Sequence, residues 1–369
     1  MRRSPVSRRL LFLLASLLLA PAAAPRAQDR VLNVYNWTDY IDPKAIAGFE
    51  KATGIKVRYD VYDSLETLEA KLAAGQSGYD VVVPTSEPTF DRLIRDGALA
   101  ALDPARLPHA AGLDPALMAQ VRSADPAGTH GVIYLWGTIG LGMLPDRVRA
   151  LAPDAPLDSW DLLLRPENAR RIAPCGISML DSAIDVIPSV LHYLHRDPDS
   201  ADPADLAAVA KVLGAIRPYI RTFASSGEVN ALAEGRVCLA LSYSGDVIQA
   251  RARAIEAKRG VDVRYVAPRE GAQLWFDMLA VPADAPHKDA ALAFIDWLLR
   301  PDVMAGITDT VHYPNAVPAS LPMVAPAIRD DPSVYPPAAA RAGFFTIHAA
   351  SAAVTRARTR MWARFKAGG

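Results

Sequence analysis

The stretch VLNVYNWTDYIDPKAIAGFEKATGIKVRYDVY (residues 31–62) decides the fold, because two strand patterns flank one helix pattern within it. Residues 31–37 are rich in strand-forming side chains. Asp42 can cap a helix whose first position is Pro43, and Gly54 is placed to end that helix. Residues 55–62 form the next predicted strand.

The alternation of strands and helices continues beyond this stretch. Asp63 and Glu66 have the spacing of a capping box in front of a helix that ends at Gly75. YDVVVP (residues 79–84) carries a continuous apolar run, which is typical of a strand covered on both faces. Strand, helix, strand, helix and strand in this order predict a parallel α/β sheet with right-handed crossovers.

The carboxyl ends of the predicted strands carry aromatic and polar side chains. Ligands of α/β sheets bind in the crevice at this edge. The rule selects Trp37, Thr38, Asp39 and Tyr40 after the first strand, and Thr85 and Ser86 after the third. A hydrophobic core does not need a carboxylate among aromatic rings, so Asp39 indicates a positively charged partner.

A second α/β block is predicted from residue 132 onward. Its strands are expected at VIYLWGTIGLGML (132–144), RRIAPCGISML (170–180) and RVCLALSYSGD (236–246), and its helices near 184–195 and 203–217. Strand patterns return at GVDVRYVAP (260–268) and WFDMLAVP (275–282), and an amphipathic helix pattern covers residues 288–304. The tail from Ala338 is rich in alanine and arginine and is expected to be partly helical.

Residues 1–27 have the features of a signal peptide. Four arginines precede an apolar run from Leu10 to Ala20 and a stretch of small residues, and cleavage after Ala24 or after Ala27 fits equally well. A membrane anchor is the weaker interpretation, because the apolar run is well short of the ~20 residues that span a bilayer. We therefore expect export and a soluble mature protein.

Charge and length narrow the class of protein. Acidic and basic residues balance at 40 each, and removal of the first 24 residues, with four arginines and no acids, leaves a net charge of −4. This charge argues against a nucleic-acid partner, which requires a basic surface. The remaining chain of roughly 340 residues exceeds what one hydrophobic core usually serves, so two domains are expected.

The chain has two cysteines, Cys175 and Cys238. In an exported protein such a pair is more often a disulfide than a metal site. A disulfide between them would stabilise the fold by roughly 4 kcal/mol, because it closes a long loop in the unfolded chain. Two unrelated buried thiols are the alternative.

Motifs of enzymes and of metal sites are missing from the sequence. Ser244 in SYSGD lacks the leading glycine of a nucleophile elbow, and no two histidines have zincin spacing. The glycines from Gly137 to Gly142 do not complete a dinucleotide-binding loop, and there is no lysine of a phosphate-binding loop. We therefore expect a protein that is not an enzyme and that uses no cofactor or metal.

Acidic residues recur beside aromatic residues in the second half of the chain, at Asp185, at Tyr243 and Asp246, and at Trp275 and Asp277. Taken singly, each of these acids has an ordinary explanation: the aromatic residue packs in a core, and the acid caps a helix or faces solvent. Asp277 fits that explanation least, because it lies in an apolar run where an unpaired carboxylate is costly to bury. A positive charge is expected near it.

Several motifs, taken in their order, resemble the periplasmic polyamine-binding proteins of ABC importers, especially the putrescine-binding branch. They are YNWTDYIDP (35–43), FEKATGIKVRYDVYDS (49–64), YDVVVPT (79–85), SWDLLLRPEN (159–168), GDVIQA (245–250), FDMLAVPADA (276–285), LLRPDV (298–303) and YPPA (335–338). The resemblance runs from about Val31 to the C-terminus. It implies a periplasmic protein with a two-lobed venus-flytrap fold, an interlobe cleft and hinge crossovers. One lobe would comprise residues 30–135 and 257–308, and the other residues 136–256 and 309–369.

The resemblance also implies a set of ligand-binding residues and a disulfide between Cys175 and Cys238. Ligand contacts are expected from Trp37, Thr38, Asp39, Tyr40, Thr85, Ser86, Asp185, Ser226, Tyr243, Asp246, Trp275, Asp277 and Tyr313. Where the putrescine binders carry Glu and Trp, this chain has Asp185 and Tyr243, which loosens the end of the pocket that measures ligand length. Putrescine, cadaverine, agmatine and spermidine therefore all stay open as ligands.

A linear diamine suits such a set, because its two ammonium nitrogens lie roughly 6 Å apart when four methylenes are extended. We expect Asp246 and Asp277 to bind one ammonium and Asp39 or Asp185 the other, with aromatic rings over the methylenes. The expected role is capture of a polyamine outside the cytoplasm by a monomer, and delivery to an ABC permease in the inner membrane. Presentation of the ligand to a membrane signalling receptor is the alternative.

Overall fold

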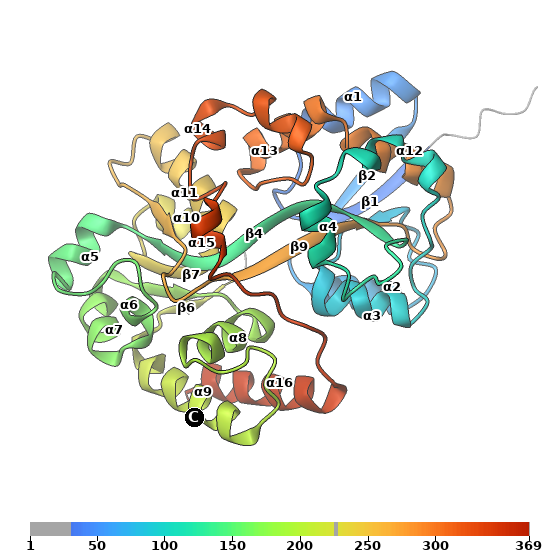
Figure 1. Cartoon of the computed structure of the whole chain (residues 1–369). Coiled ribbons are helices and arrows are strands. Elements are labelled where there is room, and N and C mark those ends of the chain that lie inside the picture. Colours follow the sequence, from blue (N-terminus) through green and yellow to red (C-terminus); the bar gives the residue numbers. More distant parts are fainter. Residues whose placement is uncertain (1–30, 225–227, 369) are drawn as a thin grey trace, which may run out of the picture.

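The computed structural model describes residues 31–224 and 228–368 as a mixed α/β fold with two lobes (Figure 1). One sheet runs through both lobes in the strand order β2-β1-β3-β9-β4-β7-β5-β6, and β8 (Arg264–Val266) pairs with β4. The predicted signal peptide and Ser226 lie outside the described residues. No helix within those two ranges is long and apolar enough to cross a membrane.

The first lobe is built on the stretch that opens the chain. β1 (Val31–Trp37) lies between β2 (Lys56–Tyr62) and β3 (Val81–Val82) and is parallel to both, as predicted. Asp42 caps α1 (Pro43–Thr53) by accepting a hydrogen bond from the Lys44 backbone N–H at 2.9 Å, and Gly54 ends it with a φ of 71°. The predicted cap of α2 (Leu65–Ala73) was wrong, because Ser64 and not Asp63 accepts from the backbone of Thr67.

The second lobe places β5 (Ile177–Met179) between β6 (Thr222–Phe223) and β7 (Leu239–Tyr243), parallel to both. The helices expected at 184–195 and 203–217 are α8 (Ala183–Tyr193) and α9 (Pro203–Ile216). The strand predicted over residues 170–175 was wrong. Pro166 begins α7 (Pro166–Ile172), whose last turn continues as a 3₁₀ turn over Ala173–Cys175, so the strand starts only after Gly176.

Two central strands connect the lobes and make the sheet mixed rather than purely parallel. β4 (Gly131–Met143) carries the chain from the first lobe to the second, and β9 (Gln273–Ala280) carries it back (Figure 1). Because they run in opposite directions, β9 is antiparallel to both β3 and β4, and β4 is antiparallel to β7. The parallel sheet predicted from the first hundred residues therefore holds only within each lobe.

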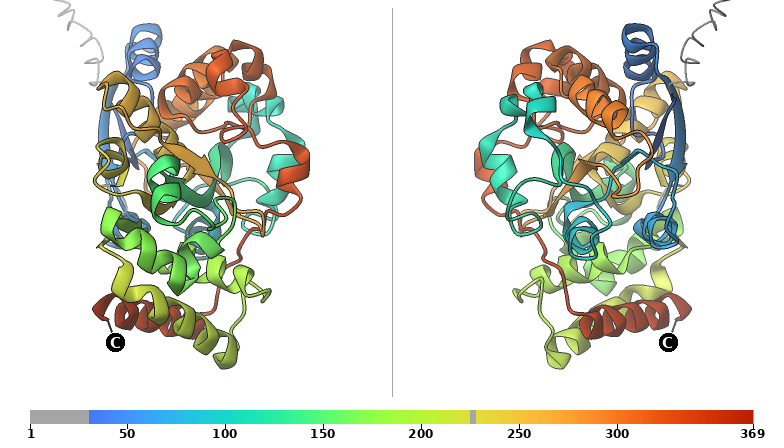
Figure 2. Two further views of the ribbon diagram at one scale, coloured as in Figure 1. Left: turned by 90° about the vertical axis from the view of Figure 1, so that its left-hand side faces the viewer. Right: turned by 90° about the vertical axis from the view of Figure 1, so that its right-hand side faces the viewer.

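The C-terminal part of the chain contacts both lobes. Pro301 divides the helix predicted over 288–304 into α12 (Lys288–Leu298) and α13 (Pro301–Val311), because a proline tolerated at a first helical position interrupts a helix interior. The tail descends from α15 (Ala338–Arg341) to α16 (Ala352–Ala367), which packs on α8 and α9 (Figures 1 and 2). The remaining helices are α3 (Asp91–Arg95), α4 (Pro115–Gln120), α5 (Pro145–Leu151), α6 (Asp161–Leu164), α10 (Glu228–Ala233), α11 (Ser244–Glu256) and α14 (Pro326–Arg329).

The predicted disulfide between Cys175 and Cys238 is present, with 5.6 Å between the two Cα atoms. It ties the turn before β5 to the residue before β7, so it holds together two neighbouring strands whose carboxyl ends face the cleft. The alternative of two separate thiols is thereby excluded.

Candidate functional site

A cavity of about 160 Å³ lies between the two lobes. Twelve of the predicted ligand-binding residues line it: Trp37, Thr38, Asp39, Tyr40, Thr85, Ser86, Asp185, Tyr243, Asp246, Trp275, Asp277 and Tyr313. The thirteenth, Ser226, lies outside the described residues. The structure therefore brings together residues from both lobes and from β9, one of the two strands that connect them.

Strand ends and strand periodicity position these side chains. β1 and β3 point their carboxyl ends at the cavity from one side, and β5 and β7 do so from the other, where α8 and α11 follow directly. Asp185 and Asp246 lie in the first turns of those two helices. On β9, Gln273, Trp275 and Asp277 occupy alternate positions, which places them on one face of the sheet.

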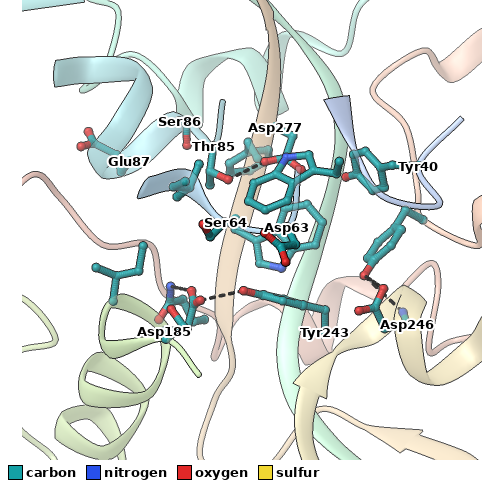
Figure 3. Close-up of a pocket in the computed structure, with 18 of the residues that line it drawn as sticks. Tyr40, Asp63, Ser64, Thr85, Ser86, Glu87, Asp185, Tyr243, Asp246 and Asp277 are labelled. Carbon is teal, nitrogen blue, oxygen red and sulfur yellow. Dashed lines mark hydrogen bonds between the residues drawn. The ribbon is translucent and has the colours of Figure 1, made fainter. Parts of the chain in front are cut away.

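Asp277 is a buried carboxylate that accepts one strong hydrogen bond. It is 4% exposed, and the Thr85 hydroxyl donates to its Oδ1 at 2.6 Å (Figure 3). Burial raises the pKa of Asp277 to about 7, although the hydroxyls of Thr85 and Tyr40 lower it. We expected a positive charge near this carboxylate, but no lysine or arginine of the described chain acts on it. A bound cation would supply the charge that the side chains do not.

Two further carboxylates lie on the second-lobe side of the cavity (Figure 3). Asp185 accepts from the Tyr243 hydroxyl at 2.7 Å and from Gln273 Nε2 at 3.3 Å, and burial raises its pKa. Asp246 accepts from the Tyr313 hydroxyl at 2.8 Å, and burial raises its pKa to about 6. Each carboxylate is therefore oriented by a tyrosine and keeps acceptor capacity for a ligand.

Aromatic rings form the walls between these carboxylates. The ring of Tyr313 lies 5.4 Å from that of Tyr40 and 5.2 Å from that of Trp275, which in turn lies 5.9 Å from Tyr243. Two glycines make room for them: a Cβ at Gly245 would lie 2.4 Å from Tyr313, and a Cβ at Gly137 would lie 2.5 Å from Trp275. Ring faces of this kind attract ammonium groups and cover methylenes.

Asp39 meets a positive charge, as its aromatic surroundings indicated, but that charge belongs to the protein. Its Oδ2 lies 2.8 Å from Nη2 of Arg253 on α11. The two side chains are 63% and 37% exposed, so the pair lies at the solvent edge of the cavity and joins the two lobes. Its predicted role as a ligand of the ammonium stays a prediction.

Several residues that line the cavity were not predicted. Tyr62 is the last residue of β2 and Ser64 follows it by two positions, so the strand-end rule applied to that strand would have found both. Gln273 shares a face of β9 with two predicted residues. Glu87 lies two positions after Thr85. Ile347 comes from the C-terminal segment, and no local pattern signals its approach to the cavity.

The arrangement suits an organic cation. Carboxylates at separated points can each accept from an ammonium, and the rings between them are apolar. No group of His, Cys, Asp and Glu side chains within residues 31–224 and 228–368 has the geometry of a metal site.

Comparisons with known proteins agree with the fold and the site. The family model for bacterial extracellular solute-binding proteins matches residues 44–336. The putrescine-binding periplasmic protein SpuD of Pseudomonas aeruginosa is 46% identical over 96% of this chain and 98% of its own length. The putrescine-binding periplasmic protein PotF of Escherichia coli is 45% identical over 93% of each chain.

A solved structure shows the same fold. The spermidine/putrescine ABC transporter substrate-binding protein PotD of Streptococcus pneumoniae superposes with a TM-score of 0.77 at 24% identity, over 92% of this chain and 99% of that one. With the family model and both relatives covering most of its length, this chain belongs to the bacterial extracellular solute-binding proteins.

Proposed function

We propose that this protein binds a polyamine in the cavity between its lobes, with putrescine the first candidate, and delivers it to an ABC importer in the inner membrane. One observation carries the proposal. Asp185, Asp246 and Asp277 line one cavity, and none of them forms an ion pair with a lysine or arginine of the described chain; Arg253, which pairs with Asp39, lowers the pKa of Asp246 but does not offset the effect of its burial. An unpaired buried charge is costly, so an organic polycation is the ligand that this cavity favours.

The relatives support this ligand class. SpuD and PotF both carry putrescine in their names, and both are described as periplasmic. A periplasmic location also agrees with the signal peptide expected at residues 1–27. We therefore propose that the mature protein works in the periplasm and performs no chemistry on its ligand.

We propose for this ligand the contacts that the sequence led us to expect. An extended diamine with roughly 6 Å between its nitrogens would place one ammonium between Asp246 and Asp277. Its other ammonium would meet Asp185, whose orientation Tyr243 and Gln273 already determine. Trp275 and Tyr313 would cover the methylenes between them. The twelve cavity-lining residues of the predicted set, together with Ser226, form the proposed binding site.

We also propose that the lobes close on the ligand. We assign residues 30–135 and 257–308 to one lobe and residues 136–256 and 309–369 to the other. Residue 136 lies inside β4, one of the two strands that cross between the lobes, and this position supports the division. The acids come from both lobes and from β9, so a bound cation contacts them together only when the cleft is closed. A permease can recognise the closed form.

Calorimetry with matched ligands tests the function. Purified mature protein should bind 1,4-diaminobutane, and n-butylamine should bind at least about tenfold more weakly, because it lacks one charged hydrogen-bonding group. Mass spectrometry should recover the bound diamine unchanged.

Succinate serves as the control of opposite charge, since it has a four-carbon chain and two negative ends. Binding of succinate, or equal affinity for the diamine and the monoamine, would contradict the proposal.

A further inference from the structure

The helix α16 carries an exposed row of arginines on the surface of the second lobe. Its sequence, AAVTRARTRMWARFKA, contains five basic residues and no acidic residue. Arg356, Arg360 and Arg364 are exposed, and they recur at every fourth position, so they lie on one face of the helix. We call these three residues the arginine stripe. It extends about 12 Å along the helix axis, because each residue adds about 1.5 Å.

The opposite face of α16 holds the stripe toward solvent. Trp362 and Phe365 are buried, and their rings lie 5.8 Å and 5.4 Å from the ring of Phe223. Arg358 also points inward, where its Nη2 donates to two backbone carbonyl groups of the segment before α9, each at 3.0 Å. These contacts determine the rotation of the helix, so the stripe cannot turn to another partner within the lobe.

No carboxylate neutralises the stripe. Within residues 31–224 and 228–368, none of its three guanidinium groups forms an ion pair or a hydrogen bond. Acids that contact the C-terminal segment have other partners, since Asp181 binds Lys366 at 2.6 Å and Asp199 lies 2.7 Å from His348 Nδ1. Like charges four residues apart destabilise a helix. The stripe therefore does not contribute to folding, and a partner outside the chain would explain it.

The stripe lies far from the cleft. Figures 1 and 2 show α16 along the outer edge of the second lobe, at the end of the molecule opposite α1. None of the three arginines lines the cavity. A partner can therefore bind the stripe without covering the entrance of the ligand. Because the mature chain has a net negative charge, attraction to an anionic partner has to come from a local surface of this kind.

The shape of the stripe favours an extended anionic surface. Guanidinium groups bind phosphates well, but successive arginines of the stripe are about 6 Å apart along a convex helix face. They cannot converge on one free phosphate, whereas lipid phosphates repeat across a bilayer. An acidic protein segment would need a groove or a fixed register, and a single convex helix face offers neither.

We propose that the arginine stripe of α16 docks this protein on the surface of an anionic phospholipid membrane. The inference goes beyond the proposed function and uses only the periplasmic location from it, which places the protein beside the inner membrane. Each arginine near an anionic bilayer strengthens binding roughly fivefold. Three arginines give an attachment that is weak and reversible, which suits a protein that also has to diffuse.

Vesicle sedimentation tests the proposal with purified mature protein at about 0.05 M salt, where exposed charges are little screened. One set of vesicles contains phosphatidylglycerol and phosphatidylcholine in equal parts, and the other only phosphatidylcholine. The parent is compared with a stripe variant and with a control variant that removes three exposed positive charges from the first lobe. The stripe variant is Arg356→Gln, Arg360→Gln and Arg364→Gln, and the control variant is Lys44→Gln, Lys51→Gln and Arg58→Gln.

The parent should bind the anionic vesicles and not the neutral ones. The stripe variant should bind the anionic vesicles at least about tenfold more weakly, and the control variant should stay within about twofold of the parent. Added salt should release the parent, because it screens exposed charges. Equal thermal unfolding of the three proteins excludes misfolding as the cause of any loss.

The other outcomes overturn the proposal. If the parent does not bind the anionic vesicles, or if both variants lose binding equally, the stripe is not a membrane-docking surface. If the parent ignores the vesicles but binds poly-glutamate through the stripe, the partner is an acidic protein segment instead. Diamine calorimetry on the same samples separates the proposed function, since the stripe variant should keep the diamine affinity of the parent. A parent that binds vesicles but no diamine would contradict the proposed function and leave membrane docking in place.

Discussion

Asp80 and Asp277 are two buried carboxylates on neighbouring parts of the same sheet, and they differ in their partners. Asp80, directly before β3, is fully buried and accepts from the backbone N–H groups of Asn33 at 2.8 Å and His287 at 2.6 Å, and it lies 3.1 Å from His287 Nδ1. Asp277, on β9 beside β3, is almost as buried, but the donor that meets it is a side-chain hydroxyl, that of Thr85 at 2.6 Å, instead of a pair of backbone N–H groups.

The difference separates a structural acid from a binding acid. Backbone donors compensate the charge of Asp80 and tie together three segments of the first lobe. The charge of Asp277 is left undercompensated, and its pKa is raised to about 7 by burial. Burial of a carboxylate therefore does not by itself indicate a binding role. The number of hydrogen-bond donors that meet the carboxylate distinguishes a structural acid from a binding acid.

The largest expected effect is on binding, from Asp277→Asn. The amide keeps the shape of the side chain and can still accept from Thr85, but it removes the charge that would meet the ammonium. Diamine affinity should fall by about 2–5 kcal/mol, which is at least about thirtyfold. Calorimetry measures this loss, and circular dichroism checks that the fold is intact. Unchanged affinity would remove Asp277 from the proposed site.

The second effect is on stability, from the matched substitution Asp80→Asn. The NH₂ group of the asparagine cannot accept, so at least one buried backbone N–H loses its partner. The free energy of unfolding should fall by about 1–3 kcal/mol, as measured by urea denaturation. Diamine affinity should stay within about twofold, on the expectation that distant sites act independently. If this variant lost binding as Asp277→Asn does, the two acids would not differ in the way described.

The third effect is a pH dependence of binding. The pKa of Asp277 is raised to about 7 and that of Asp246 to about 6, so both gain protons as the pH falls below neutrality. The diamine keeps both charges there, because amine pKa values lie near about 10. Affinity should therefore fall from about pH 8 to about pH 5, by up to about tenfold per pH unit once the pH lies below the pKa of one group.

The stability of the unliganded protein should change with pH in the direction opposite to that of the diamine affinity. The folded-state pKa of Asp277 lies above its ordinary value, so its contribution to stability is complete below about pH 4 and is lost as the pH rises through about 7. Denaturation of Asp277→Asn should lack this part of the pH dependence. A diamine affinity that rises toward acidic pH would contradict the assignment.

The smallest effect is expected from Arg253→Gln, which breaks the exposed pair with Asp39. Exposed ion pairs contribute about 0–1 kcal/mol, so diamine affinity should fall by less than about fivefold. Added salt should reduce the difference between the variant and the parent, because salt screens exposed charges. A loss as large as that of Asp277→Asn would show that the closed cleft depends on this pair.

Local sequence patterns predicted much of the fold and the site. Asp42, Pro43 and Gly54 cap and bound α1 as expected, and the residues after β1 and β3 reach the cavity. These features depend on neighbouring residues, or on strand ends that share one edge of a sheet. The resemblance to a known family added Tyr313, which no local pattern indicated, and it agreed with the disulfide that two cysteines in an exported protein had already predicted.

Two local predictions were wrong because a neighbouring residue carries the stronger signal, and other features depended on segments that are distant in the sequence. The strand expected at residues 170–175 is helical because Pro166 starts a helix there, and Ser64 displaces Asp63 as a cap by one position. Glu87 carried no motif of its own, and its burial results from packing between the lobes. The C-terminal segment reaches the cavity at Ile347 only through the docking of the tail that ends in α16.

The amino-acid sequence by itself determined the alternation of strands and helices, the helix caps and the presence of acids beside aromatic rings, because these follow from periodicity and from side chains a few residues apart. Only the tertiary structure decided which acids are already satisfied. Asp80 meets His287 and Asp39 meets Arg253 across more than two hundred residues, whereas Asp277 meets no cation in the described chain. Partners of that kind depend on where the folded chain brings distant segments together, and so does the burial that makes an unpaired charge costly.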